Sequence, residues 1–328
     1  MKLTVAVIQG GPSSEAEVSR ASAKSVARAL EASGHRVLRL ELDAYLSESL
    51  RTNGTEVAFP VSHGAVGEDG SLQGLLECLD LPYVGSNVLA SALAMNKRVA
   101  KVMFAEAGLP IAKGVSLARG GDANAAAERV LKEIGEKVVV KPCSSGSAIG
   151  VTRFDGGASA KDLARAIEEG WALDTVVLVE QFALGREGTC GVLDLHGKEP
   201  RALPPTEIRS GQDAFYTYQA RYAPGRSEHL CPPPWDEAVV KRVQEVAIGA
   251  HRALGCRDLC RVDFVVGDRP EDVVLLEVNT MPGFTDTSLY PEAAGIAGIP
   301  MAELCNALAT SARERGATPR NKAIPLPR

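Results

Sequence analysis

Acidic and amide side chains stand at strand spacing in two neighbouring stretches near the C-terminal end of the chain. Residues 261–266 and 273–279 each alternate in side-chain character, and the turn-rich segment 267–272 separates them. Side chains on a strand point to opposite faces at period two, and a hairpin would set the start of the first strand beside the end of the second. Such a hairpin would gather four polar residues at one place: Arg261, Asp263, Glu277 and Asn279.

Two carboxylates and an amide oxygen, without His or Cys, form a ligand set that suits Mg²⁺, which also takes water and phosphate oxygens. We therefore predict a metal site made of Asp263, Glu277 and Asn279. The same alternation puts Val273 and Leu275 on the same strand face as Glu277. The alternative is a polar edge strand with solvated acids. It is disfavoured because a polar loop follows the last ligand directly, where binding groups are usually placed.

The bulk composition is that of a globular protein long enough for two or three domains. Of its 328 residues, 45% are hydrophobic and 23% are charged, without long biased tracts. The net charge of −5 argues against nucleic acid as the main partner. No apolar run approaches the length of a membrane span, and the run at the start is too short for a signal peptide.

The seven cysteines are scattered, odd in number and without a Cys-x-x-Cys pair, which predicts reduced thiols in a cytoplasmic protein. Cys256 and Cys260 are four positions apart. Because no second pair or nearby His completes a zinc ligand set, we expect no structural metal there.

The first part of the chain alternates short apolar strands with helices, which is typical of an α/β unit with a parallel sheet. The acid Glu15 starts the first helix after a glycine turn, where it would repel an anion, so we predict that it faces a cation; the alternative is that it only complements the helix dipole. His63 follows a later strand, on the usual ligand side of such a sheet, although a structural role is the alternative. The predicted elements are strands at 3–9, 37–42 and 57–61 and helices at 15–33 and 72–79.

The middle of the chain contains a serine- and glycine-rich loop, residues 142–150, between two strands. Its backbone N–H groups and hydroxyls fit a lid on phosphates, with Lys141 at its root as a point charge; a flexible hairpin is the alternative. Glu180 and Glu187 stand at and just beyond a strand end, where an acid can hold ribose hydroxyls. The other predicted elements are helices at 88–107, 123–134 and 160–170 and strands at 137–141 and 175–180.

The segment 206–231 has no clear period and contains four aromatic residues, so we expect a long loop that closes over a site. A helix at 234–254 leads from it to the acidic strands.

Several motifs together resemble one family. Arg-x-Asp followed by Leu-Glu-x-Asn-Thr-x-Pro-Gly looks like the magnesium and phosphate site of the ATP-grasp ligases, and specifically of the D-alanine–D-alanine ligases; His-Gly-x-x-Gly-Glu-Asp-Gly matches as well. The resemblance runs from Val5 to about Leu308. It implies a three-domain ATP-grasp fold of the α/β class with an N-terminal parallel sheet. The implied domains are residues 1–95, 96–182 and 183–315, followed by a tail at 316–328.

The resemblance also implies a reaction and its partners. ATP phosphorylates the carboxylate of one D-alanine, and the amine of a second D-alanine attacks the acyl phosphate, which yields a peptidoglycan precursor. Mg²⁺ is expected as two ions, with Mn²⁺ as a substitute. A cytoplasmic homodimer without nucleic-acid or membrane partners is expected. The alternatives are another ATP-grasp carboxylate–amine ligase, such as one that makes D-alanyl-D-lactate or D-alanyl-D-serine, and a nucleotide-binding module without catalysis.

Residue roles follow from the resemblance position by position. Glu15 looks like the partner of the first D-alanine's ammonium, with His63 nearby, and Arg261 and the Gly283 N–H look like the oxyanion clamp. Ser288 resembles the holder of the second carboxylate. The phosphate loop departs from the family's common Arg-Glu-Gly-Ser-Ser. The remaining roles are phosphate contacts for Lys97 and Lys141, ribose or adenine contacts for Glu180 and Glu187, metal ligation by Asp263, Glu277 and Asn279, a lid-locking triad of Ser147, Tyr222 and Glu15, and a γ-phosphate contact for Arg221.

Overall fold

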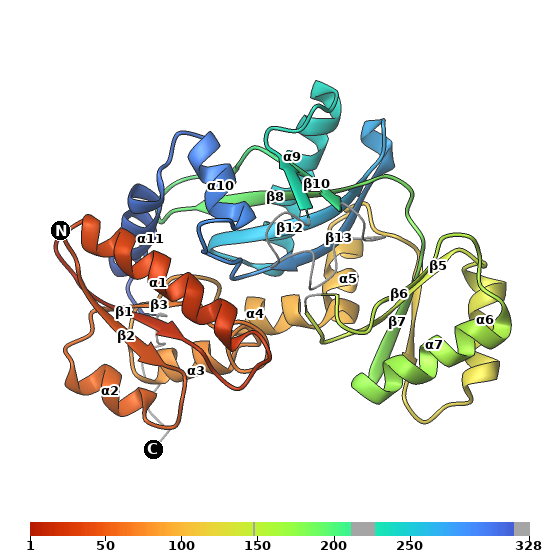
Figure 1. The fold of residues 1–328 in the computed structure, drawn as a ribbon, viewed down its shortest axis with the longest axis horizontal. Coiled ribbons are helices and arrows are strands. Elements are labelled where there is room, and N and C mark those ends of the chain that lie inside the picture. The colour runs from red at the N-terminus through yellow and green to blue at the C-terminus, as the bar shows by residue number, and fades with distance from the viewer. Residues whose placement is uncertain (147, 211–226, 318–328) are drawn as a thin grey trace, which may run out of the picture.

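The computed structural model describes residues 1–146, 148–210 and 227–317. Within them the strands form three separate sheets. Figure 1 shows these sheets spread along the longest axis, with the N-terminal sheet at one end, a small sheet from residues 114–181 at the other and the largest sheet between them. The predicted mixed α/β class with a parallel N-terminal sheet is confirmed.

The N-terminal sheet has the parallel order β2-β1-β3. β1 and β3 are short and largely buried, whereas the edge strand β2 carries three charged side chains and is partly exposed. Helices between the strands cover the sheet, which is why the sequence alternates strand and helix periods. The short helix α2 was not predicted. The elements are β1 (Thr4–Gln9), α1 (Ala16–Ala32), β2 (Arg36–Glu41), α2 (Leu46–Thr52), β3 (Val57–Pro60) and α3 (Ser71–Cys78).

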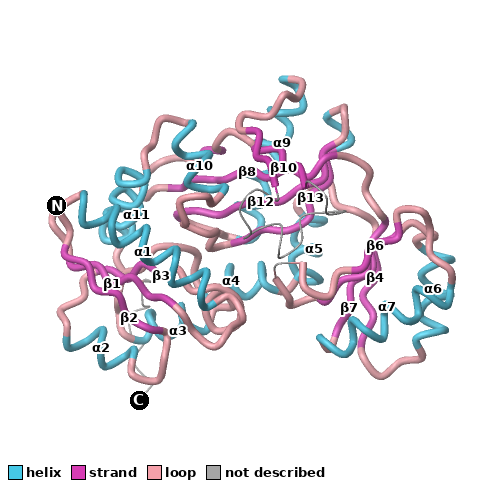
Figure 2. Tube along the Cα trace, in the orientation of Figure 1, coloured by secondary structure: helices cyan, strands magenta, loops and turns pink. Residues whose placement is uncertain are grey.

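The small sheet is antiparallel, in the order β4-β7-β5-β6. Figure 2 shows its two helices together on one side of the strands, and their apolar faces share a core with them. The opposite face of this sheet is therefore not covered by α6 or α7. The elements are β4 (Gly114–Ala118), α6 (Ala123–Glu133), β5 (Val138–Pro142), β6 (Thr152–Phe154), α7 (Ala160–Leu173) and β7 (Val176–Gln181).

The largest sheet has the order β11-β10-β8-β12-β13, with β9 paired to β8. Helix α9 packs on it. The prediction of a loop throughout 206–231 is wrong at both ends, because residues there pair as the antiparallel strands β10 and β11. The elements are β8 (Arg186–Asp194), β9 (Arg201–Ala202), β10 (Thr206–Ser210), β11 (Ser227–Leu230), α9 (Glu237–Leu254), β12 (Asp258–Val266), η1 (Pro270–Asp272) and β13 (Val273–Asn279).

The predicted helix at 88–107 is two helices, α4 (Val88–Met95) and α5 (Lys97–Glu106). The break comes from Asn96, whose backbone is extended at φ −93° and ψ 96° and whose side-chain oxygen accepts a hydrogen bond from Val99 N at 3.2 Å. An asparagine in that geometry starts a new helix rather than continuing the old one. The break places Lys97 in the first turn of α5.

The predicted β12–β13 hairpin is confirmed by its register, which pairs Asp263 with Glu277 and Arg261 with Asn279. One expectation about its faces is wrong. A bulge shifts the register beyond Asp263, so that Leu275 is buried in the core while Leu276 and Glu277 both line a cavity. An extra residue in one strand reverses the faces on either side of it.

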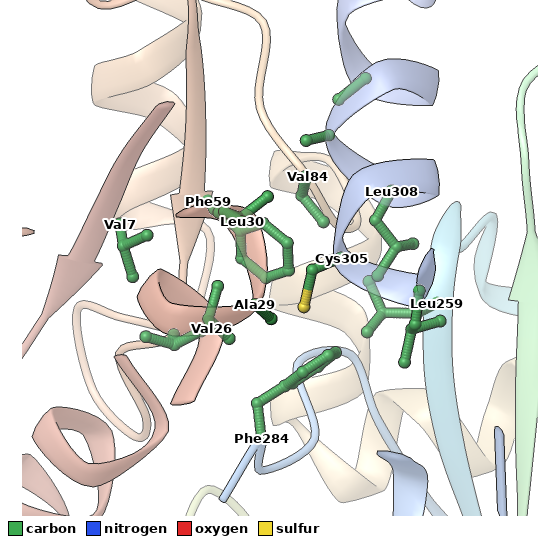
Figure 3. Close-up of a cluster of buried hydrophobic side chains, with 14 of the residues drawn as sticks. Val7, Val26, Ala29, Leu30, Phe59, Val84, Leu259, Phe284, Cys305 and Leu308 are labelled. Carbon is green, nitrogen blue, oxygen red and sulfur yellow. The ribbon is translucent and has the colours of Figure 1, made fainter. Parts of the chain in front are cut away.

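The last helices, α10 (Leu289–Ile296) and α11 (Met301–Arg315), pack beside the first helix of the chain. Figure 3 shows Ala29 and Leu30 of α1 and Cys305 and Leu308 of α11 around one buried cluster, with Phe284 below them. The C-terminal helices thus share a core with the N-terminal sheet. The domain boundaries at 95, 182 and 315 stay predictions.

Among the described residues no single helix is both long and apolar enough to cross a bilayer. A helix pair that meets that test jointly, α10 with α11, is bent by 103°.

Candidate active site

Two cavities adjoin beside the ends of β12 and β13. The first, here called the polar cavity, is lined by Glu15, His63, Arg261, Asn279 and Gly283, among others. The second, here called the apolar cavity, lies between the small and the largest sheet. It is lined by apolar side chains and by six charged groups, which are Lys97, Lys141, Arg153, Glu180, Glu187 and Glu277. The apolar lining residues used below are Val139, Val151, Phe182, Val265 and Leu276.

The two cavities meet at residues that belong to both walls. Lys97 and Glu277 line each of them, together with Ser145 and Ile149 of the serine- and glycine-rich loop. Lys97 Nζ lies 3.1 Å from Glu277 Oε2 and donates a hydrogen bond of 2.7 Å to the carbonyl of Ser145. A cation and an acid therefore mark the junction, and the same lysine ties the loop to it.

The middle of β12 holds a bidentate ion pair. Arg261 Nε and Nη2 lie 2.8 and 2.9 Å from the two oxygens of Asp263, and Thr189 Oγ1 donates to Asp263 Oδ1 at 2.8 Å. Arg261 and Asp263 are largely buried, with side chains 11% and 13% exposed. The pair brings the predicted clamp and a predicted metal ligand into direct contact.

The predicted metal ligands stand at neighbouring positions of the β12–β13 hairpin. Asp263 and Glu277 face each other across the hairpin, and Asn279 Oδ1, which accepts from Met281 N at 3.0 Å, follows two residues on. Each of the acids faces a cation, Arg261 or Lys97. An all-oxygen set of two carboxylates and an amide suits Mg²⁺, so the residues fit the ion.

A buried triad of charges stands at the junction end of the small sheet. Glu180, 3% exposed, pairs through one oxygen with Lys101 Nζ at 2.7 Å and through the other with Lys141. Lys101 also donates to the Leu275 carbonyl of β13 at 2.9 Å. The triad therefore joins α5, β5, β7 and the largest sheet.

The triad shifts the titration of all three groups. Burial alone would raise the pKa of Glu180, but the charges of Lys141 and Lys101 outweigh it and lower the pKa of that carboxyl. Burial lowers the pKa of Lys101. At Lys141 burial acts in the same direction, yet the charge of Glu180 outweighs it and raises the pKa. We conclude that the glutamate stays ionised between two lysines.

An aromatic ring and a guanidinium group lie against each other in the wall of the apolar cavity. The Arg153 guanidinium lies 5.0 Å from the centre of the Phe182 ring, and its Nη1 is 3.3 Å from Glu187 Oε1. Val265 and Leu276 line the same cavity from the largest sheet. Apolar walls with a few charged groups are typical of sites for small organic ligands.

The polar cavity contains a buried histidine with an unused ring nitrogen. His63, 6% exposed, lies with Nδ1 at 3.2 Å from Glu68 Oε1, whose other oxygen accepts from Gly64 N at 2.7 Å. Burial would lower the pKa of His63, but the hydrogen bond and charge of Glu68 and the charge of Glu15 raise it. Its Nε2 is buried and has no hydrogen-bond partner among the described residues.

Glu15 precedes α1 and is buried, 8% exposed. A Cβ atom added to Gly64 would lie 3.5 Å from Glu15 Oε2, and a Cβ atom added to Gly146 would lie 3.7 Å from the same oxygen. The carboxylate therefore sits between the histidine loop and the serine- and glycine-rich loop.

The loop after β13 is anchored to the N-terminal half of the chain. The Phe284 ring packs edge-on against Phe59, with ring centres 5.7 Å apart, and Phe284 N donates to Ser22 Oγ at 3.2 Å. Ser288 Oγ accepts from Thr285 N at 2.9 Å. A Cβ on Gly283 would come within 2.9 Å of that hydroxyl, so glycine suits this position. The anchoring fixes Gly283 in the wall of the polar cavity.

Most of the predicted residues come together. Of those that the structure describes, Asp263 and Ser288 do not line either cavity, although each contacts a neighbour of the wall. Ser147, Arg221 and Tyr222 lie outside the described residues, so their predicted roles stay predictions. The predicted functional roles of the other residues stay predictions. Glu180 has two lysine partners in the structure, and Glu187 has an arginine partner.

Sequence reasoning missed several members of the site. Lys101 lies one helical turn after Lys97, a spacing that puts both on one face of a helix, and this signal could have found it. Glu68 stood in the quoted glycine motif without a role. Phe182 and Leu276 had no signal, because strand faces from two sheets create the apolar cavity only when the chain folds.

Comparison with known proteins identifies the family. The family model described as D-ala D-ala ligase C-terminus matches residues 103–310, and the model described as D-ala D-ala ligase N-terminus matches residues 43–86.

Curated relatives and solved structures agree with these matches. A D-alanine–D-alanine ligase of Desulforudis audaxviator is 44% identical over 95% of this chain and 99% of its own, and one of Desulforamulus reducens is 42% identical over 96% and 100%. The ligase of Bacillus anthracis solved with ATP superposes with a TM-score of 0.80, at 28% identity over 95% of this chain and 99% of that one. The chain belongs to the D-alanine–D-alanine ligase family.

Proposed function

We propose that the protein joins two D-alanines to D-alanyl-D-alanine with conversion of ATP to ADP and phosphate. The observation that carries this proposal is the junction of the two cavities at Lys97 and Glu277. An apolar cavity for a nucleotide base and a polar cavity for a zwitterion open onto each other there. A phosphoryl group that crosses the junction would meet a carboxylate.

The apolar cavity suits ATP. Val139, Phe182 and Leu276 offer apolar contacts to the adenine, and Glu187 at the rim is placed for ribose or adenine hydrogen bonds. Lys141 and Lys97 supply positive charge near the junction, where the phosphates would lie. The related structure solved with ATP supports the use of this nucleotide.

The polar cavity suits the first D-alanine. Glu15 supplies a buried carboxylate for an ammonium group. The His63 Nε2 position, unused among the described residues, can serve a substrate carboxylate, because Glu68 and Glu15 favour the protonated ring. Opposite charges on opposite walls would orient the zwitterion with its carboxylate toward the ATP side.

Asp263, Glu277 and Asn279 would hold Mg²⁺. When bound, Mg²⁺ offsets charge on the transferring phosphoryl group and its leaving group. Lys97 remains beside Glu277 as a further positive charge at the same place. The number of ions, and Mn²⁺ as a substitute, belong to this proposal.

The reaction then runs in two steps. The D-alanine carboxylate takes the γ-phosphoryl group of ATP and becomes an acyl phosphate. The amine of the second D-alanine attacks the acyl carbon, and phosphate leaves after a tetrahedral intermediate whose oxyanion Arg261 and the Gly283 N–H would stabilise. A closed site keeps water from the acyl phosphate.

The product is a peptidoglycan precursor, and a cytoplasmic homodimer is the form we propose for the enzyme. We also propose D-alanine rather than D-lactate as the nucleophile, because similar ligases that make the depsipeptide tend to have phenylalanine where this sequence has Tyr222, a residue outside the described ranges.

The test is an assay of both products. Purified protein with ATP and Mg²⁺ is given D-alanine, and phosphate and dipeptide are measured together; L-alanine, D-lactate and D-serine serve as comparison substrates. We expect phosphate and D-alanyl-D-alanine in equal amounts. Phosphate release without dipeptide, or better turnover of another nucleophile, would contradict the proposal.

A further inference from the structure

A second cluster of ligand-type side chains lies on the other face of β12. His251 in the last turn of α9, Cys256 just after that helix and Cys260 on β12 present one nitrogen and two sulfurs that all lie within 4.8 Å of one another. All three are buried, at 1%, 7% and 0% exposure. The expectation that no nearby His joins this cysteine pair is wrong, because His251 stands five positions before Cys256 and the turn after α9 brings the three side chains together.

The spacing matches a tetrahedral metal site. With Zn–N bonds of about 2.0 Å and Zn–S bonds of about 2.3 Å, ligand atoms at the tetrahedral angle lie roughly 3.5–3.8 Å apart. His251 Nδ1 is 3.3 Å from Cys260 Sγ, so a small movement of the side chains admits the ion.

The histidine is already oriented for this use. Its Nε2 lies 2.9 Å from Asp194 Oδ2. A proton on Nε2 donated to that carboxylate leaves the lone pair of Nδ1 directed at the two sulfurs. An acid that fixes the tautomer of a ligand histidine is a common feature of zinc sites. This contact is independent of the proximity of the cysteines and points to the same ligand.

The charges and the position also suit a buried cation. Two thiolates and a neutral imidazole cancel the charge of Zn²⁺, which limits the cost of burying it. Cys260 lies beside Val262 and Phe264 in the core under α9, whereas Arg261 points the other way, into the polar cavity. The cluster is thus separated from the proposed Mg²⁺ ligands by the thickness of the sheet.

We propose that His251, Cys256 and Cys260 form a site for one thiophilic divalent cation, Zn²⁺, that clips the end of α9 to the start of β12. Three protein ligands leave the fourth position to a small exogenous ligand. The clip would act on stability rather than on the chemistry at the cavities.

The test is zinc binding by the full, reduced, metal-free protein in excess Mg²⁺, which keeps oxygen ligands occupied. We expect one Zn²⁺ per chain, a melting temperature that rises with free Zn²⁺, and thiolate-to-metal absorption when Co²⁺ replaces Zn²⁺. Cys256→Ser and Cys260→Ser should lose the ion. Asp194→Asn, which leaves the core intact, should weaken binding about 10- to 100-fold.

Two controls separate this site from others. Cys305→Ser removes a buried cysteine beside Met301, and Glu277→Gln removes an oxygen ligand on the opposite face; both should keep the zinc. Absence of stoichiometric uptake, or uptake that survives Cys256→Ser and is unchanged in Asp194→Asn, would overturn the proposal. Formation of a Cys256–Cys260 disulfide in place of metal uptake under the same reducing conditions would overturn it too.

Discussion

The polar and the apolar cavity share a wall but are built in different ways. The polar cavity is made of loop ends and strand ends from the N-terminal and the largest sheet, and its charged groups have partners. His63 has Glu68 in the same lining, and Arg261 has Asp263 outside the lining. The apolar cavity is made of the facing sides of two antiparallel sheets, and its charged groups stand in pairs around the apolar wall, as Lys141 does with Glu180 and Arg153 with Glu187.

The difference teaches how the two sites can be tuned. Charges in the polar cavity can act on the reacting atoms, so their loss should change the rate of the chemical step. Side chains of the apolar cavity contact a part of the substrate that does not react, so their loss should change binding alone. The following substitutions test this division.

The largest effect is expected where the two cavities meet. Glu277→Gln removes a charge from the proposed metal ligands and from the partner of Lys97. Loss of metal charge stabilisation is worth several kcal/mol, so kcat should fall by roughly 10³-fold or more. Phosphate release at saturating Mg²⁺ measures it, with the exposed acid Glu271→Gln in the same hairpin as control. Full Mg²⁺-dependent turnover in Glu277→Gln would remove this residue from the metal site.

The triad should matter for stability before it matters for rate. Glu180→Gln leaves Lys101 and Lys141 buried with one another, and breaking such a pairing costs about 3–5 kcal/mol. Denaturant unfolding at pH 7 measures this, with the exposed Glu199→Gln as control.

The pH dependence of the same variant gives a sign to check. The folded pKa of Glu180 is lowered, so its contribution to stability is present above the unfolded pKa and is lost as pH falls through the folded pKa. The difference in unfolding free energy between wild type and Glu180→Gln should therefore shrink on acidification. A difference that is constant down to the lowest pH at which the protein folds would show that ionisation of Glu180 is not its source.

Arg261 tests the polar cavity alone. Arg261→Ala removes a preorganised donor, so kcat should fall about 10²-fold while the KM for ATP changes little. Steady-state kinetics with each substrate varied measure the split, and the exposed Arg269→Ala is the matched control. A change confined to KM would make Arg261 a binding residue only.

The smallest effect is expected in the apolar cavity. Leu276→Ala removes apolar contact worth about 1–2 kcal/mol, so the KM for ATP should rise about 5- to 30-fold with kcat unchanged. Leu184, 75% exposed, gives the control substitution to Ala. An equal fall in kcat would mean that the two cavities are not separable in this way.

The same division explains what the sequence predicts. The residues of the polar cavity carry their chemistry in local patterns, so the hairpin pairing of Asp263 with Glu277 and the position of His63 after a strand follow from spacing. The face of Leu276 does not, because a single extra residue in the hairpin reverses the alternation and nothing in the local pattern marks it.

Other features had local signals that did not by themselves specify the outcome. The break at Asn96 depends on one side-chain hydrogen bond within a run of good helix formers. Lys101 gains its place only when α5 is packed against β7 and β13. His251 stands five positions before Cys256, a local spacing that could have predicted the cluster with Cys260.

The measurement that tests the central claim most directly follows an oxygen atom across the junction of the cavities. D-alanine labelled with ¹⁸O in its carboxylate is incubated with ATP and the enzyme, and the released phosphate is analysed by mass spectrometry. If the carboxylate takes the phosphoryl group, one ¹⁸O must leave with the phosphate when the second amine attacks. Phosphate that carries no label while dipeptide accumulates would contradict transfer through an acyl phosphate at Lys97 and Glu277.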